Sequence, residues 1–264
     1  VIRQLEDLAK AHNEFAKFWL DFGITRGCVK RPTMTKVYNS SHHSCFEYTR
    51  DWYQTESKKN GKELPVGNTW TPCLFLSRLI WKAMEEILTG AMKAMAWFKA
   101  VAKVCCEHDI PIRWTTPVGF PVKQRYTKWN SEVVKTRIGD KVRRHNLRVA
   151  TDQLDGRKMV NGLSPNFVHS LDSAALVATV NIAKAHGVSS FAMVHDSFGT
   201  LAADSSALAG SIRAAYASMF SEDLLRGFRD EVQAYLPAGV ELPELPEYGD
   251  LDPTCVIKSD YFFN

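Results

Sequence analysis

The stretch from Leu74 to Cys106 restricts the possible folds of this chain more than any other part of the sequence. It is rich in Ala, Met, Leu and Trp at a spacing of three to four residues, the period of an amphipathic helix. The stretch predicts one long helix, or two that join near Thr89 and Gly90. Charged side chains such as Arg78 interrupt it, and no apolar run in the sequence reaches the roughly 18 residues of a membrane-spanning helix. Its apolar stripe is therefore expected in the core of a globular protein that does not cross a membrane.

The rest of the sequence adds further helices and a few short strands. Helical periodicity recurs over four segments, 3–22, 24–38, 208–220 and 224–236. Ser164-Pro165 is typical of a helix start, and that helix is expected to reach about Ala185. Alternating residues predict short strands in 111–122 and 190–194, and the polar segment 39–72 predicts a loop with at most a short helix. We expect an α+β fold that is mostly helical.

The charged side chains are distributed unevenly. The net charge is +4, but residues 113–158 carry twelve Lys and Arg against four Asp and Glu, and residues 194–264 carry the reverse. A turn at Ile138-Gly139-Asp140 within the basic segment predicts a long basic β-hairpin over residues 127–150. This distribution fits a polyanion-binding surface beside a cation site, and equally solvated faces of opposite sign. The six scattered cysteines form no Cys-x-x-Cys pair, which favours reduced thiols over a disulfide framework or a zinc site.

Three short motifs carry residues suited to nucleotide chemistry. The first places Arg26, Lys30, Met34 and Tyr38 four residues apart, so that they lie along one face of a predicted helix. Two cations, a thioether and a phenol in a row suit a nucleoside triphosphate, whose phosphates meet the cations. Any basic amphipathic helix can produce the same spacing.

The second motif, His195-Asp196-Ser197-Phe198-Gly199, directly follows the predicted strand 190–194. A carboxylate at the apex of a turn between apolar strands is costly to bury unless a cation lies beside it. Hard cations such as Mg²⁺ prefer oxygen ligands, so Asp196 is a candidate metal ligand. The alternative is a surface turn in which Asp196 and Ser197 bond to their own backbone.

The third motif runs from Ser164 to Asp172. Asn166, His169 and Asp172 recur at three-residue spacing on one face of a predicted helix, opposite the apolar side chains of the same turns. A polar face of this kind is also typical of a solvated helix surface.

Together and in this order, the three motifs resemble the C-terminal part of the single-subunit DNA-directed RNA polymerases of bacteriophages and mitochondria. In that family the finger helix reads Thr-Arg-x-x-x-Lys-Arg-x-x-Met-Thr-x-x-Tyr-Gly, which corresponds here to Thr25–Asn39. The family's Pro-Asn-Phe-Val-His-Ser stands at 165–170 and its His-Asp-Ser-Phe-Gly at 195–199. The aromatic carboxyl terminus, 261–264, is also like the family's, and the resemblance spans essentially the whole chain.

The resemblance implies part of a right-hand polymerase architecture. Residues 1–170 would form the fingers, including a specificity-type hairpin at about 127–150. Residues 171–264 would form the C-terminal palm, with the His195-Asp196 turn and the aromatic tail.

The implied reaction is nucleotidyl transfer from nucleoside triphosphates to the 3′ end of an RNA by a two-metal mechanism. Asp196 would be one of two catalytic aspartates that hold two Mg²⁺ ions. Arg26 and Lys30 would bind the triphosphate, and Lys30 would also donate a proton to the pyrophosphate leaving group. The other implied site residues are Met34, Tyr38 and His169 at the nucleotide, and His195 and Ser197 at the primer end.

The basic hairpin would enter the major groove of promoter DNA, because Arg and Lys read guanine edges and phosphates. The sequence does not decide which of four candidates touches a base: Arg137, Arg143, Arg144 and Arg148. The implied partners are double-stranded promoter DNA, template DNA, nascent RNA and nucleoside triphosphates. The implied compartment is the cytoplasm of an infected bacterial host.

Two residues depart from the family pattern. Asn39 replaces the family's Gly, and because Asn tolerates positive φ better than other non-glycine residues, the turn is expected to survive. Pro32 falls inside the finger helix and removes the N–H that would bond the carbonyl of Cys28. Either this helix is kinked or its regular part begins near Pro32.

The family's other catalytic aspartate lies upstream of the finger helix, in an Asp-Gly-Ser type motif. Only 25 residues precede Arg26, and neither Asp7 nor Asp21 fits that motif. We therefore expect half of an active site, inactive without an N-terminal portion that is a second chain or the rest of a longer one.

Two other functions remain open on the sequence. The chain could be a non-catalytic nucleic-acid-binding module that keeps the basic hairpin. Alternatively, His195-Asp196 could be the metal-binding pair of a phosphohydrolase, with His169 and a later Asp as further ligands, although in that class the pair usually lies on a helix.

Overall fold

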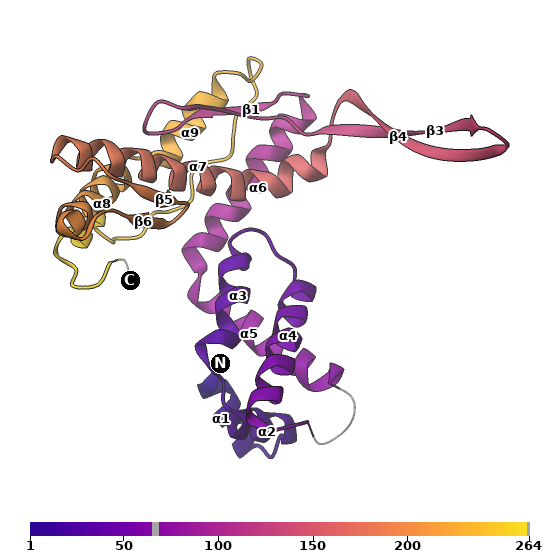
Figure 1. Ribbon diagram of the computed structural model, residues 1–264, viewed down its shortest axis with the longest axis vertical. Helices are drawn as coiled ribbons and strands as arrows, with labels where there is room; N and C mark the ends of the chain where they lie inside the picture. Colours follow the sequence, from indigo (N-terminus) through magenta and orange to yellow (C-terminus); the bar gives the residue numbers. More distant parts are fainter. Residues whose placement is uncertain (65–68, 263–264) are drawn as a thin grey trace. The chain divides into compact units, whose positions relative to one another are not determined.

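The computed structural model describes residues 1–64 and 69–262, which pack as two compact units, Val1–Ala96 and Trp97–Asn264 (Figure 1). Helices dominate, and the described strands form three two-stranded antiparallel sheets. The expectation of a mostly helical α+β fold is confirmed. Within the described ranges, no helix is both long and apolar enough to cross a membrane. The last two residues of the aromatic tail, Phe263 and Asn264, lie outside the described part of the chain.

The first unit is built from helices. In chain order these are α1 (Ile2–Lys10), α2 (Glu14–Phe22), α3 (Arg26–Lys36), α4 (His42–Asn60), α5 (Trp70–Ile87) and the first half of α6 (Thr89–Glu107). The predicted junction near Thr89 is confirmed, because α5 ends at Ile87 and α6 begins two residues later. The indole Nε1 of the fully buried Trp19 donates to the carbonyl of Pro72, 3.1 Å away, and so ties α2 to α5.

Two predictions about this unit are wrong. Residues 3–22 form two helices rather than one, because His12 takes a positive φ of 63° and the Asn13 side chain caps α2 by accepting from the N–H of Ala16. Residues 39–72 contain the 19-residue helix α4. Its buried stripe contains few strongly apolar residues, so the pattern is weak in the sequence; the stripe is Cys45, Phe46, Thr49 and Tyr53.

The described part of the second unit combines strands of 3 to 14 residues with the second half of α6 and three further α-helices. After α6 come β1 (Ile112–Thr115), β2 (Pro121–Gln124), β3 (Thr127–Ile138), β4 (Lys141–Leu154), α7 (Gly156–Ala185), β5 (Ala192–Val194), β6 (Ser197–Gly199), α8 (Ser205–Phe220) and α9 (Leu224–Gln233). Short 3₁₀ turns lie at Ala202–Asp204 and Pro253–Lys258. The strands predicted in 111–122 and 190–194 are confirmed.

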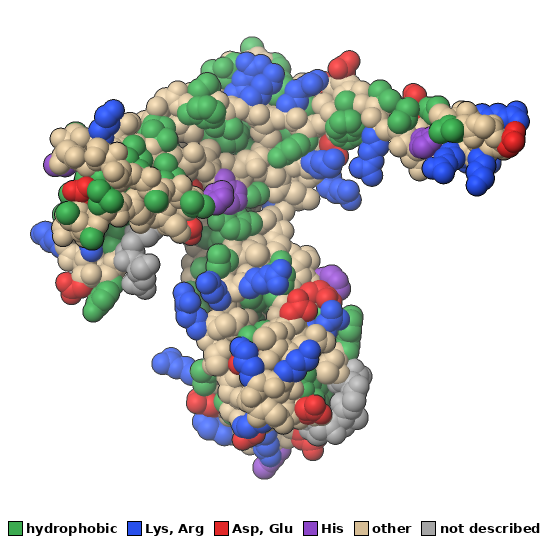
Figure 2. Space-filling view, in the orientation of Figure 1, with side chains coloured by type: hydrophobic (Ala, Val, Ile, Leu, Met, Phe, Trp, Pro, Cys, Tyr) green, Lys and Arg blue, Asp and Glu red, His purple; other side chains and the backbone are tan. Residues whose placement is uncertain are grey.

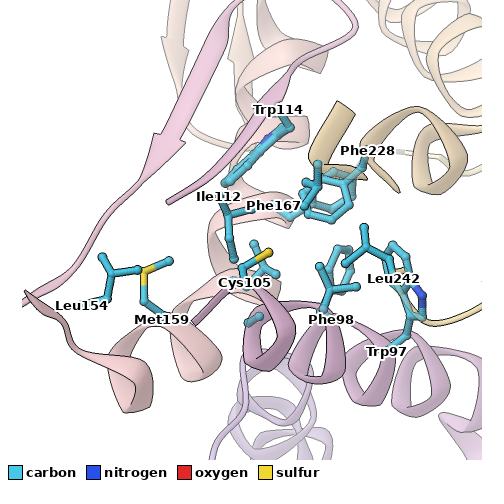
Figure 3. Packing of buried hydrophobic residues seen from close by; sticks show 14 of the residues in the cluster. Trp97, Phe98, Cys105, Ile112, Trp114, Leu154, Met159, Phe167, Phe228 and Leu242 are labelled. Carbon is cyan, nitrogen blue, oxygen red and sulfur yellow. The ribbon is translucent and has the colours of Figure 1, made fainter. Parts of the chain in front are cut away.

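An aromatic cluster forms the core of the second unit (Figure 3). Phe228 of α9 makes edge-to-face contacts with Trp97, Phe98, Trp114 and Phe167, at centroid separations of 5.1 to 5.9 Å. Edge-to-face aromatic pairs stabilise a fold by more than the burial of their apolar surface alone. The cluster therefore joins α6, β1, α7 and α9 into one body.

Helix α7 begins at Gly156, nine residues before the predicted first helical residue, Pro165. Asp155 caps it by accepting from the N–H of Lys158 at 3.1 Å, and Pro165 lies inside the helix rather than at its first turn. The buried residues Met159 and Leu163 hold the early turns against the core. The boundary expected at 170/171 falls within this continuous helix, so the division into fingers and palm remains a prediction about function.

Candidate active site

Helix α3 carries the first candidate motif on its exposed face. Arg26, Lys30 and Met34 are exposed, whereas Cys28 and Pro32 are buried. Because each residue turns a helix by about 100°, positions two apart point to nearly opposite sides. The two cations and the thioether therefore share a surface stripe, and the intervening positions pack inward.

The fourth residue of that motif, Tyr38, lies beyond the helix. The N–H of Ser40 bonds the carbonyl of Thr35 and the N–H of Asn39 bonds that of Lys36, each at 3.1 Å. Together with the φ of 67° at Asn39, these bonds form a Schellman helix end, which normally carries Gly at the left-handed position. The expectation that Asn39 takes a positive φ is confirmed, and Tyr38 is half-buried in the turn that precedes it.

Pro32 does not mark the beginning of regular helix. Helix α3 begins at Arg26 and continues through Pro32 to Lys36, so the alternative that its regular part starts near the proline is wrong. The hydroxyl of Thr35 donates to the carbonyls of Arg31 and Pro32, at 3.0 and 3.3 Å. The burial of Pro32 holds the helix in place where the proline removes a backbone donor.

Lys36 anchors the end of α3 to α5. Its side chain is 3% exposed, and the ammonium lies 3.2 Å from the Oε1 atom of Glu85 and 3.1 Å from the centroid of the Trp81 ring. A buried cation needs such partners because burial removes its hydration. This contact fixes the helix end from which Tyr38 continues.

The second motif forms the tip of a two-residue hairpin. Strands β5 and β6 pair from Ala192↔Gly199 to Val194↔Ser197, so His195 and Asp196 are the turn. His195 has a positive φ of 53°, a conformation that only Gly adopts without cost. On the inner side, Met193 and Phe198 pack in the cluster that contains Leu208 of α8.

Asp196 is exposed at this tip, so the premise that burial makes its carboxylate costly does not hold. His195 and Ser197 beside it are exposed as well. The tip therefore presents a carboxylate to solvent, where an incoming ligand can reach it. The predicted strand–turn placement is confirmed, and it differs from the helical His-Asp pair of phosphohydrolases.

Asp172 and Tyr216 lie within the electrostatic field of Asp196. Burial and the charge of Asp196 raise the pKa of Asp172, while His169 opposes that rise. Burial and the two carboxylates also raise the pKa of Tyr216. The Nδ1 atom of His169 lies 3.8 Å from the Oδ2 atom of Asp172. The fold thus brings His169, Asp172 and Asp196 into one region. No pattern in the sequence indicated that Tyr216 would lie near these carboxylates.

The carboxylate oxygens of this group are the type of ligand that Mg²⁺ prefers, but their number meets only part of what the ion needs. Mg²⁺ is commonly bound by one or two carboxylates together with phosphate oxygens and water. Asp196 and Asp172 supply two carboxylates in one region, but within residues 1–64 and 69–262 no set of three or more His, Cys, Asp or Glu side chains is arranged to hold a metal ion.

Most of the third motif serves as framework. The Nδ2 atom of Asn166 donates to Gln124 at 2.8 Å and to the hydroxyl of Tyr126 at 2.9 Å, which ties α7 to the base of the long hairpin. Ser170 accepts from the indole of Trp114 at 2.9 Å, and Phe167 belongs to the aromatic core. These contacts leave His169 on the exposed side of α7.

Strands β3 and β4 form an antiparallel hairpin in which Ile138 pairs with Lys141 at the turn. Lys and Arg side chains are visible along its length (Figure 2). The four candidate arginines are all exposed, at positions 137, 143, 144 and 148. The hairpin and the Asp196 tip belong to the second unit, whereas α3 belongs to the first.

Comparison with known proteins yields one consistent family. Residues 1–240 match the family model described as DNA-dependent RNA polymerase. The chain is 32% identical over 250 residues to "DNA-directed RNA polymerase 1, mitochondrial" of Arabidopsis thaliana, which covers 95% of this chain and 24% of that protein. It is 30% identical to the DNA-directed RNA polymerase of Enterobacteria phage T3, covering 98% of this chain and 31% of that protein. For T7 RNA polymerase of Escherichia phage T7 the identity is 30%, covering 93% and 30% respectively. The chain thus spans about a quarter to a third of the length of the curated relatives it matches.

Proposed function

Because the chain belongs to the DNA-dependent RNA polymerase family, we propose that it takes part in DNA-directed RNA synthesis, by nucleotidyl transfer from nucleoside triphosphates to the 3′ end of an RNA. It would contribute one of the two catalytic aspartates, Asp196. The other would come from an N-terminal portion, in the same or a separate chain. As the phage relatives suggest, the place of action would be the cytoplasm of an infected bacterial host.

The observation that carries this proposal is the exposed Asp196 at the tip of the β5–β6 hairpin. The packed pair Met193 and Phe198 holds the hairpin on the core, while the turn keeps the carboxylate accessible. Asp196 would hold Mg²⁺, and the ion when bound would lower the pKa of the attacking 3′-hydroxyl and neutralise charge on the phosphates. His195 and Ser197, on either side of Asp196, would support the primer end.

The exposed stripe of α3 would bind the incoming nucleotide. Arg26 and Lys30 present two cations on one face, which suits the charge of a triphosphate. Lys30 would also donate a proton to the pyrophosphate leaving group, and Met34 and Tyr38 would contact sugar and base. The exposed His169 would contribute to recognition of the ribose 2′-hydroxyl.

The β3–β4 hairpin would bind promoter DNA. A two-stranded β-ribbon fits the major groove of B-DNA, and this ribbon carries exposed Lys and Arg on both strands. Template DNA and nascent RNA would be the other nucleic-acid partners.

The test is Mg²⁺-dependent extension of an RNA primer on a DNA template, with the chain alone and with the N-terminal portion of a related polymerase. We expect extension in the mixture only, and Asp196→Asn should reduce it by at least about 100-fold. The matched control is Asp250→Asn, which removes the same charge from an exposed site in the same unit. DNA binding should be unchanged in both variants.

Other outcomes would redirect the proposal. Extension by the chain alone would mean that a carboxylate within it completes the pair, and Asp172→Asn would then identify whether that carboxylate is Asp172. DNA binding without extension in either condition would favour a non-catalytic nucleic-acid-binding module.

A further inference from the structure

The register of the β3–β4 hairpin separates its basic side chains onto two different faces. Residues directly opposite each other in an antiparallel pair share a face, and successive pairs alternate. Arg144 lies opposite Lys135, and Arg143 lies opposite Thr136. These neighbouring arginines therefore point to opposite sides of the ribbon.

One face, which we name the cationic face, carries most of the Lys and Arg side chains of residues 129–150. Its paired positions include no acidic residue, although Asp140 of the turn lies 3.8 Å from Arg137. Its neutral members include Asn146, the exposed Val133 and Val142, and Trp129 near the base of the hairpin. Trp129 is 55% exposed. The charged members of the cationic face are Lys135, Arg137, Arg144 and Arg148.

The other face, which we name the apolar face, has a different composition. It carries the acidic Glu132, His145 and, near the turn, Arg143 and Lys141, and it has more exposed aliphatic side chains than the cationic face. The exposed apolar members are Val134, Ile138, Leu147 and Val149. A carboxylate is repelled by phosphates, and aliphatic side chains form no hydrogen bonds with base edges; what they can contact there is the methyl group of thymine.

A ribbon in the major groove can direct only one face at the base edges. Arg pairs with guanine and Asn with adenine through two hydrogen bonds, and Lys contacts phosphates or guanine. From Val142, opposite Arg137, to Arg148 the strand covers about 20 Å at roughly 3.3 Å per residue. That length matches about six base pairs at a rise of about 3.4 Å. The cationic face has the chemistry and the length of a base-reading surface.

We propose that the hairpin reads duplex DNA with the cationic face alone, Arg144 and Arg148 contacting bases while Arg143 points away from them. The inference rests on the proposed function and deepens it, because it assigns sequence readout to particular side chains. Every residue in 128–150 is exposed except Thr136, which is intermediate, so substitution on either face leaves the packed core intact.

Arg143 and Arg144 form a matched pair for the test, since they are adjacent, exposed and equal in charge. The full chain is first used to select binders from a pool of duplexes with a randomised central segment. The enriched duplex then serves as the probe for Arg143→Ala, Arg144→Ala and Arg148→Ala. We expect Arg144→Ala and Arg148→Ala to weaken binding about 10-fold or more and to relax the preference at one base pair each. Arg143→Ala should weaken binding less than about threefold, with the preference intact.

Three results would overturn the proposal. One is a loss in Arg143→Ala equal to or larger than that in Arg144→Ala. The second is the absence of any enriched duplex, and the third is equal competition by single-stranded DNA of the same sequence. Primer extension measures the polymerase proposal separately. A chain that selects a duplex through Arg144 but extends no primer would support the face assignment and contradict the catalytic role.

Discussion

At the scale of single residues, Lys36 and Glu85 form an ion pair whose members are buried to different degrees. The Lys36 side chain is 3% exposed and that of Glu85 is 51% exposed. Removing the carboxylate leaves a buried cation with one fewer partner, whereas replacing Lys36 removes the charge and its need for a partner. The two substitutions are therefore not equivalent.

We predict that Glu85→Gln lowers the free energy of unfolding by about 2 kcal/mol and Lys36→Met by about 1 kcal/mol. The matched control is Glu86→Gln, which neutralises an exposed carboxylate on the same helix and should cost less than about 0.5 kcal/mol. Denaturant unfolding monitored by Trp fluorescence measures all three. A larger loss in Lys36→Met would show that the packing of the lysine stem outweighs its charge.

The environment of His42 leads us to predict that the stability of the folded chain depends on pH. Its ring packs edge-on against Trp81 at a centroid separation of 5.6 Å. Burial lowers its pKa, and the cations Arg78 and Lys36 lower it further. Because the unfolded chain takes up the proton at the ordinary pKa near 6.5 and the folded chain only at lower pH, stability is retained above about pH 7 and lost as the pH falls through 6.5. In thermal unfolding between pH 7.5 and 5.5, His42→Gln should flatten this decline, whereas substitution of the exposed His43, the smallest contributor to the lowered pKa, should change it far less.

At the scale of elements, the end of α3 depends on the left-handed conformation of Asn39. An alanine there would retain the unfavourable contact between its Cβ and the following carbonyl, without the local hydrogen bonds of an Asn side chain. We predict that Asn39→Ala lowers the free energy of unfolding by about 1 kcal/mol, whereas Asn39→Gly leaves it unchanged or raises it. Thermal melts of the two variants, compared with Ser40→Ala, measure this effect. Equal melting temperatures for Ala and Gly at position 39 would contradict it.

Elements with few strongly apolar residues were the hardest to predict. Helix α4 was missed because its buried stripe includes Cys45 and Thr49, which do not stand out in a polar segment. Helix α7 was shortened because Pro165 looked like a first-turn residue, while the cap at Asp155 lies ten residues earlier. In both, burial against other segments outweighs the local signal.

At the scale of the whole molecule, each unit has its own hydrophobic core. One core centres on residues such as Trp19 and Leu76, and the other on residues such as Phe98 and Phe228. Buried thiols are present in both units. Burial raises the pKa of Cys45 to about 11 and those of Cys73 and Cys105 to about 12. These thiols are unreactive while folded, so they report opening of their own unit.

We predict that Phe228→Ala accelerates the alkylation of Cys105 at pH 7.5 and leaves Cys45 and Cys73 protected, because it removes about 3–5 kcal/mol from the second core only. Trp19→Ala should do the reverse. Mass spectrometry of peptides after timed labelling resolves the two patterns, with the exposed Cys255 as an internal reference. Equal acceleration in both units would mean that they open together.

The sequence by itself determined what depends on neighbours a few residues apart. The exposed stripe of Arg26 and Lys30 follows from the helical period, and the turn at His195-Asp196 follows from a short strand that ends in polar residues. The order of the three motifs pointed to the family that the comparisons identify. These features are local, because a helix or tight turn is set by hydrogen bonds within four or five residues.

Only the tertiary structure decided what depends on segments far apart. It placed Asp172 and Tyr216 near Asp196, and it buried Lys36 against Glu85. It also separated Arg143 from Arg144, because the pairing of β3 with β4 fixes which side chains share a face. Composition fixes the number of charges in a chain, but the register of strands and the packing of helices decide which charges meet, since each contact joins residues that the sequence holds apart.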